Sequence, residues 1–276
     1  MHPVLVTGAS KGIGRATARL LADRGIGVFA GVRGEGDADA LRRDSDRITP
    51  VMLDVTDRDG IAAAAERVSR EAPDGLSGVV NNAGIVVPGP LEFLPLEHLR
   101  TQLEVNVVGV VAVTQAFLPL IRRGAGRIVN VSSINGRVAV PFIGPYAMSK
   151  FAVEAMSDAL RMELRRWNIP VVVIEPGAIE TPIWQTSQRR AARISGELGS
   201  AARDSYGGVL RAFETGSGRP PKHAIPPQRV ARVIERALSA RRPRTRYLVG
   251  LDAHLAALAK AVLPDRLIDR LITSRR

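Results

Sequence analysis

The sequence predicts an α/β fold in which helices cover both faces of a doubly wound, parallel β-sheet. Short, continuously apolar segments recur along the chain, as expected for strands that are buried on both faces. Stretches with helical periodicity separate these segments, so each pair of strands has room for a helical crossover. With 276 residues, 45% of them hydrophobic, the chain can fold as one large domain with a substantial core.

Apolar runs of strand length occur at seven places along the chain. They lie at 4–6, 27–32, 48–55, 78–84, 126–133, 170–177 and 246–250. Helical patterns connect these runs. The patterns lie at 13–25, in an alanine-rich stretch that ends near Glu71, at 96–122, from Tyr146 onward and at 226–238. This alternation predicts a single domain over residues 1–276 with about seven parallel strands.

Two segments depart from the alternation. Residues 182–226 are polar and arginine-rich, and long irregular segments of this kind often form lids or binding loops. We therefore expect a substrate loop or lid there. The amphipathic extension at 251–276 carries apolar residues on one stripe and arginines elsewhere. It could cover the substrate pocket, pack against a partner subunit or, as the less favoured alternative, rest peripherally on a membrane surface.

Composition excludes several kinds of site. The chain has no cysteine, so it forms neither disulfides nor cysteine-ligated metal sites. Its four histidines are scattered without the spacing of metal ligands, and no metal is expected. The N-terminus lacks the features of a secretory signal, and no run of 18 apolar residues is free of charge. We therefore expect a cytoplasmic protein without a membrane-spanning helix.

The formal net charge of +12 is the unusual feature of the composition. The basic residues are mostly arginines, and they are spread along the chain rather than gathered in one block. A positive surface can attract nucleic acid or anionic lipid, but scattered arginines favour a small anionic partner such as a cofactor. We therefore expect no nucleic-acid partner.

The segment TGASKGIG lies between the first predicted strand and the first predicted helix. A glycine-rich turn at this place lets the backbone approach a pyrophosphate, and the helix N-terminus offers free N–H groups. Its position in the first crossover of a parallel sheet predicts a dinucleotide site rather than an ordinary tight turn. The expected contacts are Gly8, Ser10, Lys11, Gly12, Ile13 and Gly14.

The end of the second strand indicates which dinucleotide is bound. NAD binding favours a carboxylate there, for the 2′-hydroxyl of the adenosine ribose, whereas this strand runs into Arg33. Arg33 and Lys11 could pair with a 2′-phosphate, so we predict NADP(H), with NAD(H) as the alternative. Otherwise Arg33 is a solvated loop residue. After the third strand, Asp54 and Val55 are placed to contact the adenine, unless Asp54 only caps the next turn.

Several short motifs occur in the order that is typical of one enzyme family. They are TGASKGIG, the NNAG of Asn81–Gly84, Asn106 in LEVNVVG, the serine of VSS, Tyr146 and Lys150 in YAMSK, and Pro176–Gly177. From residue 4 to about residue 182 the chain thereby resembles the short-chain dehydrogenase/reductase family. The phrases VFAGVR, SDALRMELRRW and IEPGAIETPI most resemble its retinol and 17β-hydroxysteroid dehydrogenase branch.

This resemblance implies a Rossmann-type fold and a role for each motif. It implies a homodimer or homotetramer assembled through the two long central helices. The implied catalytic residues are Asn106, which would hold a water against the lysine, Ser133, Tyr146, and Lys150, which would also bond the nicotinamide ribose. The further implied cofactor contacts are Asn82, Ala83 and Gly84 at the ribose, Pro176, Gly177 and Ile179 around the nicotinamide, and Thr181 at its carboxamide.

The spacing of Tyr146 and Lys150 explains how a phenol could transfer protons. Residues four apart share one face of a helix, so the ammonium should lower the phenol pKa from its ordinary value of about 10. Tyr146 would then act as a general acid or base. Ser133, thirteen residues earlier at the carboxyl edge of the sheet, could hold the substrate oxygen beside it.

We therefore expect an oxidoreductase that transfers hydride between NADP(H) and an alcohol or carbonyl on a hydrophobic substrate. The alternative is a non-catalytic NADP-binding sensor or scaffold on the same fold. The complete catalytic set argues against that alternative, because a pure binder does not need the tyrosine. Ordinary core packing explains Phe142 as well as a substrate contact does. The expected substrate contacts are Ser133, Phe142, Tyr146, Ile183, Trp184 and Tyr206.

Overall fold

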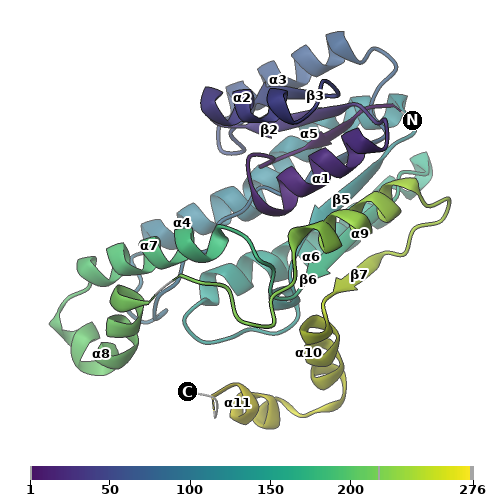
Figure 1. Ribbon diagram of the computed structural model, residues 1–276. Helices are drawn as coiled ribbons and strands as arrows, with labels where there is room; N and C mark the ends of the chain where they lie inside the picture. Colours follow the sequence, from purple (N-terminus) through teal and green to yellow (C-terminus); the bar gives the residue numbers. More distant parts are fainter. Residues whose placement is uncertain (1, 217, 274–276) are drawn as a thin grey trace.

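Seven parallel strands form one sheet at the centre of the protein (Figure 1). The computed structural model describes residues 2–216 and 218–273. The strands are β1 Val4–Val6, β2 Val28–Val32, β3 Ile48–Met52, β4 Gly78–Asn81, β5 Arg127–Val131, β6 Val171–Pro176 and β7 Arg246–Val249. They lie in the order β3-β2-β1-β4-β5-β6-β7, and every neighbouring pair is parallel. The predicted doubly wound sheet is therefore confirmed.

The direction of winding reverses at β1. This strand pairs with β2 on one side and with β4 on the other, so that Val4 lies opposite both Val28 and Gly78. At such a switch point a crevice opens beyond the carboxyl ends of the strands, and ligands bind there. The loops that follow β1 and β4 meet at this edge, although they lie far apart in the sequence.

Alternation along the strands builds a core on each face of the sheet. Val4 and Val6 point to one face, where they pack with helices α1, α2 and α9. Leu5 points to the other face, where α3, α5 and α6 contribute to the core. The sequence did not predict α2, because its buried face is only Ala38 and Leu41. The bounds of these helices are α1 Gly12–Asp23, α2 Glu35–Asp44, α3 Arg58–Glu71, α5 Gly109–Arg123, α6 Gly144–Glu163 and α9 Pro227–Ser239.

The helical pattern predicted at 96–122 is one stretch with a change of geometry inside it. Helix α4 (Leu96–Leu103) continues through a π-helical turn at Glu104–Val108 into α5. By length and composition alone, the stretch Leu96–Arg123 could cross a membrane. However, Val113 and Phe117 of α5 are completely buried in the core beside the sheet, which is the position of an internal helix of a globular domain.

Residues 182–226 are largely helical, so the prediction of an irregular segment was wrong. Helices α7 (Ile183–Glu197) and α8 (Ser200–Thr215) occupy most of the segment. Their buried faces include small residues such as Ala191 and Ala202, which weakens the apolar periodicity of this arginine-rich sequence. Figure 1 shows α7 beside α4, with α8 at the end of the molecule.

The C-terminal extension forms two further helices, α10 (Leu251–Val262) and α11 (Asp265–Thr273). The predicted extension continues to residue 276, and its last three residues lie outside the described residues. Figure 1 shows both helices projecting from the body of the protein after β7. Their large exposed apolar side chains are Leu251, Leu255, Leu258, Val262, Leu267 and Leu271.

Candidate active site

The glycine-rich turn connects β1 directly to α1. Gly8 and Gly12 have φ values of +62° and +53°, in the left-handed region that favours glycine. Lys11 precedes the helix without a side-chain cap, so the first N–H groups of α1 have no side-chain acceptor there. A Cβ on Gly14 would collide with the carbonyl oxygen of Gly8. The tight turn and the uncapped helix end fit the pyrophosphate of a dinucleotide.

The segment after β6 approaches this turn from the other side of the crevice. A Cβ on Gly12 would lie only 3.0 Å from Cγ2 of Thr181. Of the two other predicted contacts in the turn, Ser10 is partly buried, and the side chain of Ile13 packs against the core. The structure therefore brings Thr181 to the glycine-rich turn.

A second link joins the glycine-rich turn to the loop after β4. The hydroxyl oxygen of Thr7 accepts hydrogen bonds from the backbone N–H groups of Asn82 and Ala83, each at 3.0 Å. In return, Nδ2 of Asn82 donates to the carbonyl oxygens of Thr7 at 2.9 Å and Gly8 at 3.1 Å. Thr7 was missed as a site residue, although it begins the glycine motif. Its hydroxyl fixes the two predicted cofactor loops against each other.

The predicted adenosine contacts lie after β2 and β3. Arg33 is 75% exposed, and its Nη1 atom lies 4.0 Å from Oδ2 of Asp54. Asp54 also caps the following turn, because its Oδ1 atom accepts hydrogen bonds from the N–H and the hydroxyl of Thr56. The neighbouring Val55 is buried. The structure thus shows the capping role for Asp54, and its contact with adenine stays a prediction.

Asn106 lies in the π-helical turn and joins two parts of the site. Its Oδ1 atom accepts from the N–H of Ile85 at 2.9 Å, and its Nδ2 atom donates to the carbonyl oxygen of Ile85 at 3.0 Å. The same Nδ2 lies 3.1 Å from the hydroxyl of Ser149, which donates to the carbonyl oxygen of Tyr146. The amide therefore ties the loop after β4 to the start of α6. Its predicted contact with a water stays a prediction. Gly84 lies beside this amide, because its Cβ would be 3.4 Å from Oδ1.

Ser133, Tyr146 and Lys150 meet at the carboxyl edge of β5. The Ser133 hydroxyl lies beside the Tyr146 phenol and acts to lower its pKa. Nζ of Lys150 donates to the carbonyl oxygen of Val131 at 2.8 Å and lies 5.6 Å from the centre of the Tyr146 ring. The predicted grouping of these three side chains is therefore present, and the bond from Lys150 to Val131 joins the first turns of α6 to the end of β5.

The electrostatics of this group differ from the sequence-based expectation. Burial raises the pKa of Tyr146, and the neighbouring Ser133 hydroxyl only partly opposes that change. The expected net lowering of the phenol pKa is therefore wrong for the cofactor-free protein, because burial is the largest influence on the phenol. Burial also lowers the pKa of Lys150 to about 8, while the nearby Glu154 carboxylate acts in the opposite direction.

The loop after β6 completes the edge of the crevice. The carbonyl oxygen of Pro176 lies 3.5 Å from the Ser133 hydroxyl, and Gly177 donates its N–H to Val249 at 2.9 Å. Ile179 is buried and pairs with Ile225, where the chain returns from α8. Of the predicted nicotinamide residues, Pro176 thus lies beside the proposed catalytic serine.

The predicted substrate residues divide into two groups. Phe142 and Tyr206 contact each other edge to face, with ring centres 5.9 Å apart. Phe93 and Phe213 extend this aromatic cluster, which joins the loop before α6 to α8. By contrast, the indole of Trp184 donates to the carbonyl oxygen of Ile179, so it supports the backbone of the cofactor loop. Ile183, at the start of α7, is partly buried.

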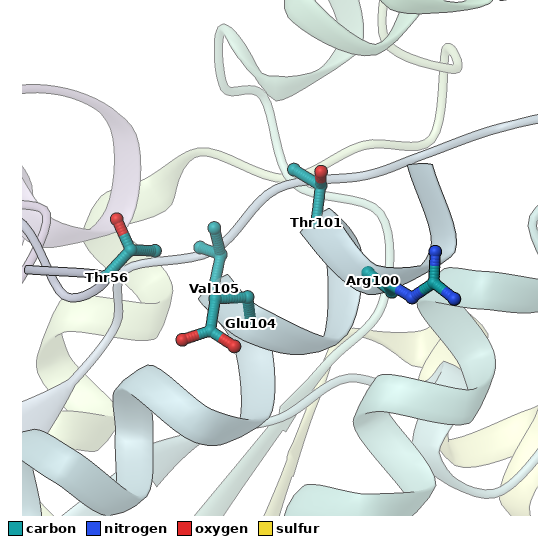
Figure 2. Close-up of a pocket in the computed structure, with 5 residues that line it drawn as sticks. All are labelled: Thr56, Arg100, Thr101, Glu104 and Val105. Atoms are coloured by element: carbon teal, nitrogen blue, oxygen red, sulfur yellow. The ribbon is translucent and has the colours of Figure 1, made fainter. Parts of the chain in front are cut away.

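Two surface hollows lie away from this constellation. Figure 2 shows the first, of about 360 Å³, where Thr56 faces four residues of the α4 and π-helical stretch. The second, of about 570 Å³, lies along α3 and α5. Neither hollow is lined by Ser133, Tyr146 or Lys150. Within residues 2–216 and 218–273, no group of three His, Cys, Asp or Glu side chains could hold a metal.

Comparison with known proteins agrees with this arrangement. A family model described as short chain dehydrogenase matches residues 2–192. Human retinol dehydrogenase 16 is 40% identical and human 17-beta-hydroxysteroid dehydrogenase type 6 is 39% identical to the chain, and each alignment covers 98% of this chain and 87% of the relative. A short-chain dehydrogenase from Burkholderia cenocepacia J2315, crystallised with NADP, superposes with a TM-score of 0.77 at 27% identity. That superposition covers 99% of this chain and 98% of the other.

The fold, the ordered motifs and the convergence of Ser133, Tyr146 and Lys150 all agree with these matches. The chain belongs to the short-chain dehydrogenase family.

Proposed function

We propose that the protein is an NADP(H)-dependent oxidoreductase that interconverts an alcohol and its carbonyl, with Tyr146 as the general acid and base. The observation that carries the proposal is the meeting of Ser133, Tyr146 and Lys150 at the same sheet edge as the glycine-rich turn. A bound nicotinamide would supply or accept the hydride. The chain itself supplies binding, orientation and the proton.

The residues around the crevice suit a dinucleotide along its whole length. The glycine-rich turn would hold the pyrophosphate, and the loops after β4 and β6 would hold the nicotinamide half. Thr7 and Asn82 keep the first two of these loops together. Lys150 is buried and points its ammonium to the same edge, where ribose hydroxyls are suitable acceptors.

Proton transfer would take place at the phenol oxygen of Tyr146. In the reducing direction the phenol gives its proton to the carbonyl oxygen, and Ser133 donates a hydrogen bond to the same oxygen. Because burial raises the pKa of Tyr146, the phenol is protonated at neutral pH and is ready to act as the acid. Lys150, with a pKa of about 8, is mostly charged at pH 7 and stabilises the phenolate that remains.

The preference for NADP(H) is supported by the surroundings of Arg33. The guanidinium is largely exposed, and its contact with Asp54 is long at 4.0 Å, so it can turn to a 2′-phosphate at little cost. Another family member was crystallised with NADP. Replacing Arg33 with alanine should raise the Kd of NADPH about tenfold and leave that of NADH unchanged. Equal effects on both dinucleotides would refute this assignment.

The substrate is proposed to be a bulky apolar alcohol or ketone. Two relatives that are 39–40% identical over nearly the whole chain are named as retinol and 17-beta-hydroxysteroid dehydrogenases. The aromatic cluster of Phe93, Phe142, Tyr206 and Phe213 lies between α8 and the loop that leads to Tyr146, and it offers apolar surface on that side. A panel of steroid and retinoid alcohols and carbonyls, followed by nicotinamide absorbance, tests this proposal.

The Tyr146→Phe variant tests the mechanism. It should keep the wild-type affinity for NADPH, because the change removes one hydroxyl, while turnover falls by a factor of about 100 to 10,000. Tyr247→Phe is the matched control, since Tyr247 lies in β7 and its hydroxyl accepts a bond from the N–H of Arg244, away from the proposed catalytic residues. Unchanged turnover in Tyr146→Phe would refute the mechanism. Dinucleotide binding without turnover of any substrate in the wild type would favour a non-catalytic binding protein.

A further inference from the structure

The first turn of α10 reaches back to the loop after β6. Asp252 lies in this turn, and its Oδ2 atom accepts a hydrogen bond of 2.7 Å from the backbone N–H of Ala178. The preceding Gly250 has a φ of +110°, which only glycine adopts readily, and this sharp turn starts the helix immediately after β7. The C-terminal extension is thereby tied to the segment that follows Pro176.

Gly177 shows how closely the carboxylate approaches. A Cβ at this position would collide with both side-chain oxygens of Asp252. Gly177 does not have a positive φ, so its backbone conformation would accept alanine. With Asp252 in this position, a side chain at residue 177 would force the carboxylate to move.

The same short segment borders the proposed catalytic group. Pro176 places its carbonyl oxygen 3.5 Å from the Ser133 hydroxyl, and Gly177 donates its N–H to Val249. On the far side, the N–H of Ile225 donates to the carbonyl oxygen of Ala178 at 3.0 Å. The backbone N–H of Ala178 is therefore bonded by Asp252, a residue of the C-terminal extension, rather than by a residue of the sheet.

We propose that Asp252 is a positioning residue that holds the Pro176–Ala178 segment against the nicotinamide half of the cofactor. The inference rests on the proposed function, because the resemblance to the family places this segment at the nicotinamide. It gives the C-terminal extension a role within its own active site, independent of any partner subunit or membrane. A charged acceptor on a backbone N–H forms a strong hydrogen bond, so its loss should loosen the segment.

The direct test measures dinucleotide affinity by fluorescence titration of NADPH, or of NADH if the wild type prefers it. Asp252→Ala should raise Kd about tenfold, whereas Asp252→Asn, which keeps a side-chain acceptor, should stay within about threefold of the wild type. Asp269→Ala is the matched control, because this carboxylate is exposed in the same extension. Amide exchange of Ala178 in the cofactor-free protein should accelerate in Asp252→Ala and not in the control.

A double-mutant cycle with Gly177→Ala separates a steric clash with Asp252 from one with the cofactor. Gly177→Ala alone should weaken dinucleotide binding. Combined with Asp252→Ala, it should weaken binding much less, because the carboxylate with which the new methyl group collides has been removed. An equal penalty in both backgrounds would overturn the inference, and so would an Asp252→Ala variant within twofold of the wild-type Kd. A wild type that binds no dinucleotide would instead overturn the proposed function and the inference with it.

Discussion

The buried ammonium of Lys150 makes the stability of the protein depend on pH in an unusual direction. Only 6% of Lys150 is exposed, and burial lowers its pKa from 10.5 to about 8. In the unfolded chain the amine regains its ordinary pKa. Between these two values the unfolded chain binds one more proton than the folded protein does, so stability rises with pH in that window. Below pH 8 both states are charged, and the folded state carries the full desolvation penalty.

The size of the effect follows from the two pKa values. They differ by about 2.5, and each pKa unit corresponds to 1.36 kcal/mol, which gives about 3 kcal/mol over the whole window. At pH 10 the lysine of the unfolded chain has not yet lost its proton completely. The free energy of unfolding should therefore rise by about 2.5 kcal/mol between pH 7 and pH 10. Lysines on a protein surface have no comparable effect, since their pKa is similar in the folded and unfolded states.

The measurement is urea unfolding of the cofactor-free protein at several pH values, for the wild type and for Lys150→Met. Methionine keeps the apolar stem and removes the titrating group, so the difference between the two proteins isolates Lys150 from other titrations. The free energy of unfolding of the wild type should rise relative to the variant by about 2.5 kcal/mol from pH 7 to pH 10. A difference that stays constant within about 0.5 kcal/mol would refute the reasoning about the buried ammonium.

Three other substitutions have defined outcomes. Arg137→Gln leaves the completely buried carboxylate of Glu175 without its two hydrogen bonds. Denaturant titrations should show a free energy of unfolding that is lower by about 3–5 kcal/mol. Additional replacement of Glu175 with glutamine should recover most of that loss. Asn130→Ala removes the side chain that hydrogen-bonds both Asn81 and Ser157 in the core. Thermal unfolding should show a loss of stability of about 2–3 kcal/mol, and a loss below about 0.5 kcal/mol would contradict this expectation. Gly14→Ala should abolish dinucleotide binding in a fluorescence titration, because the methyl group collides with the glycine-rich turn, whereas Gly36→Ala, which meets open space, should bind normally.

The sequence predicted the features that depend on local pattern. Seven apolar runs separated by helical stretches were sufficient for a parallel α/β sheet, because strands buried on both faces need crossover helices. The spacing of Tyr146 and Lys150 placed both side chains on one face of α6, since a helix turns every 3.6 residues. Ser133 could be assigned to the same place because carboxyl ends of parallel strands share one edge of the sheet.

Other features were decided by contacts between distant parts of the chain. The bond between Asp252 and Ala178 joins residues 74 apart, and no local pattern connects them. Helices α7 and α8 escaped prediction because their buried faces form only where they meet the rest of the fold. The directions in which the pKa values of Tyr146 and Lys150 shift were also beyond the sequence, since burial in the tertiary structure is the largest cause of both shifts. Periodicity and spacing determined which residues come to the crevice, whereas burial in the tertiary structure decided their charge and what holds them there.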